Sequence, residues 1–85
     1  MRHASAYASI MSPVYLRVKE LRVALGLTQA ELAARAGIRR ATVSRIENRQ
    51  VTAIDFRVLE RLADVLGVDP GFLFARVPVA GVKRG

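Results

Sequence analysis

Three glycines, each followed by an aliphatic residue, divide this chain into short segments and so limit the lengths of its helices. The pairs are Gly26-Leu27, Gly37-Ile38 and Gly67-Val68. Glycine readily takes the left-handed conformation that ends a helix, and the aliphatic residue behind it closes the end with an apolar contact. Apolar residues recur at helical spacing before each pair. The sequence therefore predicts an all-α domain built from short helices and tight turns.

The first helix is expected to begin at Pro13, with Ser12 as its N-cap, and to end before Gly26. Its apolar residues at spacings of 4, 3 and 4 would form one buried face. An alternative interpretation makes Val14–Leu16 a short strand, because Val, Tyr and Leu alternate there. The fold prediction therefore includes possible short terminal strands.

Four more helices follow from local start signals. Thr28 and Glu31 form a capping box that opens a helix over 29–36. A third helix is expected over 40–47. Asp55 is the predicted N-cap of a fourth, with Ile54 and Leu59 as a hydrophobic staple, and Asp69-Pro70 begins a short fifth. The predicted apolar faces contain Val14, Val18, Leu21, Leu25, Leu32, Val43, Ile46, Phe56, Leu59, Leu62, Ala63, Leu66, Phe72, Leu73 and Phe74.

A chain of 85 residues has room for one small domain. We expect a core domain over residues 13–75, a flexible arm or start-site extension over 1–12, and an extended basic tail over 76–85. Hydrophobic residues make up 52% of the chain, which is enough for a packed core. Neither a membrane span of ~20 apolar residues nor the apolar core of a signal peptide is visible, so the prediction is a cytoplasmic protein with no membrane contact.

The composition excludes several kinds of chemistry. The chain has no cysteine, and its single histidine is His3, near the chain start. No nucleophile–base pair, paired carboxylates, metal-ligand cluster or glycine-rich phosphate loop is recognisable. The sequence thus predicts no enzyme activity, no metal and no cofactor. The 14 basic residues exceed the 7 acidic ones and give a net charge of +7, which favours a polyanionic partner.

The segment 28–48, TQAELAARAGIRRATVSRIEN, predicts two short helices joined by a tight turn. Small Ala33 lies where the helices must approach closely. This is the helix-turn-helix pattern, whose second helix can enter the major groove of DNA. From about Val14 to Phe74 the chain resembles the phage-repressor family, also called Cro-like or XRE. The residues that carry the resemblance are Leu21-Arg22, Leu25-Gly26, Thr28-Gln29, Glu31-Leu32-Ala33, Gly37, Thr42-Val43-Ser44, Ile46-Glu47-Asn48, Leu59, Leu62-Ala63, Leu66-Gly67-Val68 and Leu73-Phe74.

The resemblance implies contacts with double-stranded DNA. Gln29 matches the family's phosphate-contact position, at a helix N-terminus whose dipole favours an anion. The helix over 40–47 matches the recognition helix, and arginine pairs bidentately with guanine. The expected base-reading residues are Arg39, Arg40, Ala41, Ser44 and Arg45. The expected contacts to the DNA backbone are Gln29, Thr42, Asn48 and Arg49.

Arg39 and Arg40 could simply keep the surface soluble. However, cations at a helix N-terminus are disfavoured by the helix dipole by about 0.3–1 kcal/mol each. Arg39 also occupies a position where the family often has a capping serine or threonine. An external polyanion would explain both features.

Glu47 is an acid on a basic helix. The resemblance implies an ion pair between Glu47 and Arg22 that joins two helices, whereas the alternative is contact with cytosine. After Asn48 the family commonly has glycine, but here Arg49-Gln50 follows. Asn48 is expected to take the left-handed cap itself. The sequence does not predict the path of the loop over 49–53.

These observations predict a sequence-specific, DNA-binding transcriptional repressor that acts as a homodimer by occupying its operator. The apolar stretch 72–79 is the candidate dimer surface. An alternative is the antitoxin or controller subunit of a two-gene module, which also binds a protein partner through the tail over 76–85. A pure interaction module without DNA binding is disfavoured by the arginines at 39, 40, 45 and 49.

Overall fold

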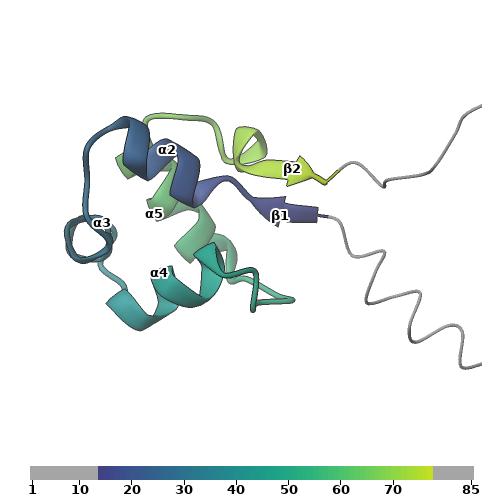
Figure 1. Ribbon diagram of the computed structural model, residues 1–85, viewed down its shortest axis with the longest axis horizontal. Helices are drawn as coiled ribbons and strands as arrows, with labels where there is room; N and C mark the ends of the chain where they lie inside the picture. Colours follow the sequence, from purple (N-terminus) through teal and green to yellow (C-terminus); the bar gives the residue numbers. More distant parts are fainter. Residues whose placement is uncertain (1–13, 78–85) are drawn as a thin grey trace, which may run out of the picture.

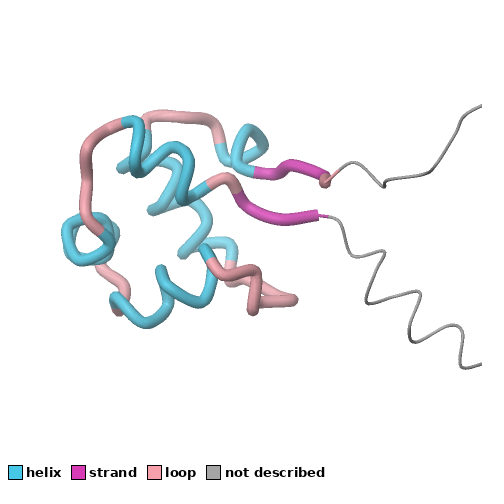
Figure 2. The backbone as a smooth tube through the Cα atoms, viewed as in Figure 1, coloured by secondary structure: helices cyan, strands magenta, loops and turns pink. Residues whose placement is uncertain are grey.

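Within residues 14–77, four α-helices surround a small core and a two-stranded sheet is present. The sheet projects from one side of the helices (Figures 1 and 2). The computed structural model describes residues 14–77. Its helices are α2 (Val18–Ala24), α3 (Gln29–Ala36), α4 (Arg40–Glu47) and α5 (Phe56–Leu66). The 3-10 helix η1 (Pro70–Leu73) follows α5, and the strands β1 (Val14–Leu16) and β2 (Phe74–Arg76) lie at either end of the described part.

The helix ends form as the sequence predicts. Gly26, Gly37 and Gly67 all have a positive φ, between 69° and 73°. The capping box before α3 is complete: the Glu31 N–H donates to Thr28 Oγ1 at 3.0 Å, and the Thr28 N–H donates to the Glu31 carboxylate at 2.8 Å. The Asp55 carboxylate caps α5 by accepting from the Arg57 N–H at 2.7 Å. These local contacts fix the predicted bounds of α3 and α5.

The first helix ends before Gly26 as predicted, but its predicted start at Pro13 is wrong and the alternative strand is correct. Val14–Leu16 is β1, and it pairs antiparallel with Phe74–Arg76 in the register Tyr15 opposite Ala75. The Arg17 N–H then donates to the Leu73 carbonyl at 2.7 Å, and α2 starts only at Val18. The pairing partner lies about sixty residues away, so helical spacing near Pro13 could not reveal it.

The core lies between α2, α3, α4 and α5. Its buried residues are Val18, Leu32, Ala33, Ala36, Val43, Ile46, Leu59, Leu62, Ala63, Leu66 and Leu73. Ile54, predicted to form a staple with Leu59, packs against this cluster, to which Leu59 belongs. Five residues predicted on apolar faces are instead about half exposed or more: Val14, Leu25, Phe56, Phe72 and Phe74. Phe56 departs furthest, at 82% exposure, because it is the first residue of α5 and lies outside its buried face.

The cap predictions fail at two further positions. Asn48 ends α4 with φ −90°, and the left-handed residue is Arg49, with φ 58°. The turn therefore closes one residue later than expected. Asp69 precedes η1 in the predicted N-cap position but makes no side-chain capping bond.

The ends of the chain lie outside the described residues. The predicted arm over 1–12, including His3 and the Ser12 cap, cannot be compared with the structure for that reason. Of the predicted tail over 76–85, only Arg76, the last residue of β2, and Val77 are described. Within residues 14–77, no helix combines the length and apolar character needed to cross a membrane.

Candidate functional site

α3 and α4 pack directly against each other around the turn at Gly37. Ala33 and Ala36 from α3 and Val43 and Ile46 from α4 are all buried in the common core. The small alanine side chains allow the close approach that the helix-turn-helix pattern requires. α4 is thus held by one apolar face, and its opposite face lies along an edge of the molecule (Figure 1).

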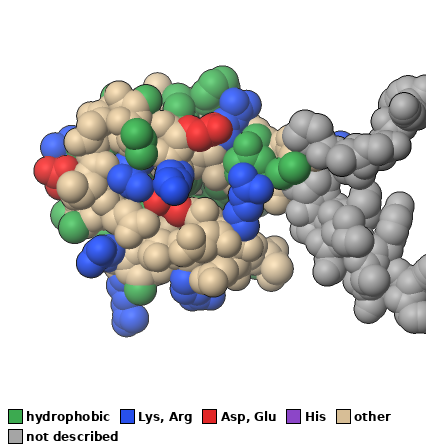
Figure 3. Space-filling view, in the orientation of Figure 1, with side chains coloured by type: hydrophobic (Ala, Val, Ile, Leu, Met, Phe, Trp, Pro, Cys, Tyr) green, Lys and Arg blue, Asp and Glu red, His purple; other side chains and the backbone are tan. Residues whose placement is uncertain are grey.

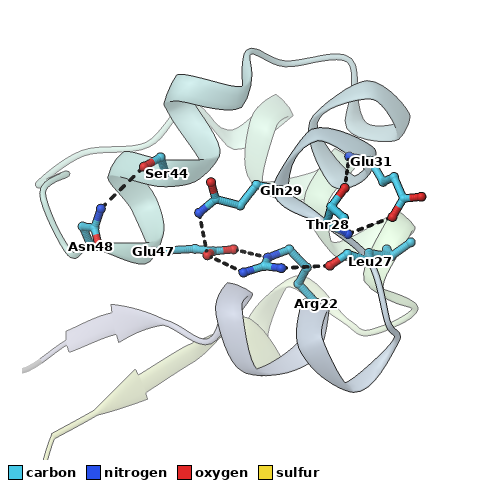
Figure 4. A network of polar contacts seen from close by, with 8 residues as sticks. All are labelled: Arg22, Leu27, Thr28, Gln29, Glu31, Ser44, Glu47 and Asn48. Carbon is cyan, nitrogen blue, oxygen red and sulfur yellow. Dashed lines mark hydrogen bonds and ion pairs between the residues drawn. The ribbon is translucent and has the colours of Figure 1, made fainter.

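Arg22 and Glu47 join α2 to α4 through a bidentate ion pair (Figure 4). Arg22 Nε donates to Glu47 Oε2 at 2.6 Å, and Arg22 Nη2 donates to Oε1 at 2.9 Å. Gln29 Nε2 adds a third bond to Oε1 at 3.0 Å. Arg22 Nη1 donates in turn to the Leu27 carbonyl at 2.8 Å, before α3. The network therefore ties three helices and one turn together, and the contact implied by the family resemblance is present.

The two side chains of this pair are shielded from water, with 13% of Arg22 and 3% of Glu47 exposed. Burial by itself raises the pKa of Glu47, but hydrogen bonds from Arg22 and Gln29 and the charges of Arg22 and Lys19 outweigh it, so this pKa lies below its ordinary value. The hydrogen bond to Glu47 raises the pKa of Arg22. The carboxylate is therefore ionised and neutralised inside the fold.

The depressed pKa of Glu47 predicts an acid-sensitive contribution to stability. Since the folded pKa lies below the unfolded value of about 4.3, the contribution is full above that pH and is lost as the pH falls through the folded pKa. Urea unfolding at a series of pH values should show wild type and Glu47→Gln converging on acidification. A constant difference in unfolding free energy down to low pH would contradict the prediction.

The outward face of α4 is basic. Arg40, Ala41 and Arg45 are exposed, as is Arg39 immediately before the helix. Ser44 is half-buried on the same helix. Figure 3 shows basic side chains, and no acidic ones, along the edge that carries α4. Arg39 makes no side-chain capping bond, so the N-terminus of α4 lacks this stabilisation. The five predicted base-reading residues therefore lie on or beside one short helix.

The four residues predicted to contact the DNA backbone differ in solvent exposure. Asn48 and Arg49 are exposed at the end of α4, and Thr42 is half-buried within it. Asn48 Nδ2 lies 3.5 Å from Ser44 Oγ, at the limit of a hydrogen bond. Gln29 is half-buried, and one N–H of its amide is occupied by Glu47. A side-chain amide carries a second N–H, so the Glu47 bond does not exhaust its capacity to donate.

Sequence reasoning missed two partners of the site. It gave Gln29 no contact with Glu47, although both residues were singled out. It also missed Tyr15, whose ring lies 3.9 Å from the guanidinium carbon of Arg49. The alternating Val-Tyr-Leu segment could have indicated Tyr15, because it predicts a strand. Only the strand β1, and not the predicted first helical turn, places Tyr15 beside Arg49 at the end of α4. No group of three potential metal ligands occurs among residues 14–77.

Comparison with known proteins identifies the family of this arrangement. The helix-turn-helix family model HTH_3 matches residues 18–73. No curated protein gives a significant match. Among solved structures, a chain of the SinR protein/SinI protein complex is similar, with 32% identity and a TM-score of 0.64 over 66% of this chain. This chain spans only about half, 54%, of that one.

A second solved structure is that of SinR, described as the master regulator for biofilm formation, in complex with DNA. It is 33% identical, with a TM-score of 0.62, and the match covers 65% of this chain and 87% of the other. Because the family match spans α2 to η1 and includes the whole helix-turn-helix, the chain belongs to the XRE-type helix-turn-helix family of DNA-binding regulators.

Proposed function

We propose that this protein is a sequence-specific transcriptional repressor that binds double-stranded DNA as a homodimer and acts by occupying its operator. The observation that carries the proposal is the outward face of α4, where exposed arginines flank the small Ala41. The one acid at the end of this helix, Glu47, is neutralised by Arg22 and leaves the face positive. A groove lined with phosphates and guanine edges matches such a helix.

Each residue class has a separate task in this proposal. Arg39, Arg40, Ala41, Ser44 and Arg45 would meet base edges in the major groove. Gln29, Thr42, Asn48 and Arg49 would contact phosphates, which supply affinity and fix the register of the protein on the duplex. Two copies would occupy major-groove segments about 34 Å apart, so the operator would have two-fold symmetry. The half-exposed residues Phe72 and Phe74, with Val77, offer an apolar surface for the second copy.

The direct test compares Arg45→Ala with Arg49→Ala. Arg45 lies on the exposed face one turn beyond Ala41, so its loss should cost about 1–3 kcal/mol on the preferred site and relax preference at one base pair per half-site. Arg49 follows the helix end, so its loss should weaken binding to all duplexes and reduce the salt slope by about one unit per site. Binding is measured on the preferred site, a single-base variant and random duplex.

Arg35→Ala is the matched control, because it removes an exposed arginine from the last turn of α3 and leaves α4 intact. We expect little change in sequence preference for this variant. If Arg45→Ala lowers the affinity for all three duplexes in parallel, Arg45 contacts phosphate and the base-reading face has been misassigned.

A second candidate function is the antitoxin or controller subunit of a two-gene module. It draws support from the similar chain found in a complex of SinR with SinI and from the apolar residues exposed near β2. Co-expression with the product of the adjacent gene distinguishes the two: a stable complex that releases DNA favours the controller, and separate purification favours the homodimeric repressor.

A further inference from the structure

Arg49 is the only residue other than glycine with a positive φ among residues 14–77. It closes α4 as the left-handed residue: its N–H donates to the Ile46 carbonyl at 3.1 Å, and the Gln50 N–H donates to the Arg45 carbonyl at 2.9 Å. The α2, α3 and α5 ends use glycine in the equivalent place. A side chain here is disfavoured because Cβ approaches the following carbonyl. The arginine thus occupies a position where glycine would fit with less strain.

The Arg49 side chain is held by Tyr15. The guanidinium carbon lies 3.9 Å above the centre of the Tyr15 ring, within the range of a cation–π contact. Tyr15 is the middle residue of β1 and is half-buried, with Ala75 of β2 opposite it. The sheet therefore fixes the ring. Stacking engages a face of the planar guanidinium and leaves its N–H groups free at the edge, where they can donate to a phosphate.

The stack borders an open groove of about 320 Å³ between β1, α2 and the end of α4. Its charged lining consists of Arg17, Lys19 and Arg49 against Glu20 and Glu47. Glu47 is already paired with Arg22, so Glu20 is the one carboxylate of the lining left to balance three basic side chains. The groove therefore continues the positive surface of α4 beyond the helix end and favours an anion there.

We propose that Tyr15 is a positioning residue for DNA binding, which holds the strained Arg49 at the end of α4 so that its guanidinium meets the DNA backbone. This inference rests on the proposed function. It extends the DNA-contacting machinery to β1, outside the helix-turn-helix. It also gives a reason for the arginine at a glycine-type helix end: the stack and the phosphate contact compensate for the unfavourable backbone conformation.

The test is a double-mutant cycle on Tyr15→Leu and Arg49→Ala, with affinity for random duplex DNA at several salt concentrations as the readout. A cation–π contact on the surface corresponds to about a two- to five-fold change in affinity if it preorganises the arginine. Tyr15→Leu should lower affinity by that factor alone and should have no effect when Arg49 is already alanine. Tyr15→Phe keeps the ring and should restore wild-type affinity.

Two further variants guard against effects on folding. Arg49→Gly removes the strain and should keep the melting temperature at or above that of wild type, while still weakening DNA binding. Phe56→Leu removes an aromatic ring that is 82% exposed at the start of α5 and has no assigned contact, so it should leave DNA affinity unchanged.

Equal losses of affinity for Tyr15→Leu in the presence and absence of Arg49 would overturn the inference, as would full DNA affinity of Arg49→Gly. Either result leaves DNA binding through α4 intact if wild type binds, but full affinity of Arg49→Gly would also remove Arg49 from the proposed phosphate contacts. Failure of wild type to bind any duplex at low salt would overturn the proposed function and this inference with it.

Discussion

The affinity for DNA is expected to fall about 10³–10⁵-fold when the salt concentration rises from roughly 50 to 200 mM. A dimer that contacts phosphates through Gln29, Thr42, Asn48 and Arg49 on each copy would make roughly 6–10 such contacts and release the condensed counterions. The net charge of +7 per chain supports the same expectation. The measurement is a binding titration across this salt range, with the slope of log K against log salt as the result.

Arg49→Ala and Arg35→Ala separate phosphate contacts from general charge in that experiment. Both remove one exposed arginine. Only Arg49→Ala should reduce the slope by about one unit per site, because only Arg49 is assigned a phosphate. An affinity that hardly changes with salt, or equal slopes for both variants, would be incompatible with the proposed contacts.

Glu47→Ala should lower the free energy of unfolding by about 3–5 kcal/mol, the range for breaking a buried ion pair by removing one partner. The alanine leaves two Arg22 donors and the Gln29 amide without their acceptor in a site where only 13% of Arg22 is exposed. The whole free energy of unfolding of a small domain is roughly 5–15 kcal/mol. The melting temperature should therefore drop by at least about 12 °C, and DNA binding should be lost through unfolding.

Glu60→Ala is the control for this substitution, because it removes an exposed carboxylate from α5. Its melting temperature should lie close to that of wild type. Should Glu47→Ala melt like wild type and lose only sequence preference, the role of Glu47 would be readout of DNA and not the joining of α2 to α4.

The helix ends were predictable because their determinants are local. Thr28 and Glu31 lie within one turn of each other, and Gly37 and Gly67 need only their own left-handed conformation to end a helix. The bounds of α4 followed from its apolar spacing and not from a capping signal, since Arg39 makes no side-chain capping bond. The cap prediction failed at Asn48, because the left-handed residue is Arg49, whose guanidinium lies over the distant Tyr15 ring.

The strand pair was not predictable with the same certainty, since it depends on contacts between the two ends of the domain. The sequence of Val14–Leu16 is compatible with either a helix face or a strand. It forms a strand because it pairs with Phe74–Arg76. Phe56 shows a second limit. An aromatic residue near the start of an amphipathic helix was assigned to the core, but the buried face of α5 begins further along, at Leu59.

The candidate site was only partly predictable. The exposure of Arg40, Ala41 and Arg45 follows from the helical period once Val43 and Ile46 are buried. The Arg22–Glu47 contact came from the family resemblance, because residues 25 positions apart give no periodic signal. The link from Gln29 to Glu47 and the stack of Arg49 on Tyr15 required the three-dimensional arrangement.

Selection of bound sequences from a pool of random duplexes tests the central claim, sequence-specific recognition by α4, most directly. We expect an enriched site with two-fold symmetry, half-sites about one helical turn apart and a guanine in each half-site that Arg45→Ala no longer selects. Recovery of unenriched sequences, bound as tightly as any single site, would contradict the account, because the basic face of α4 would then bind DNA by charge alone.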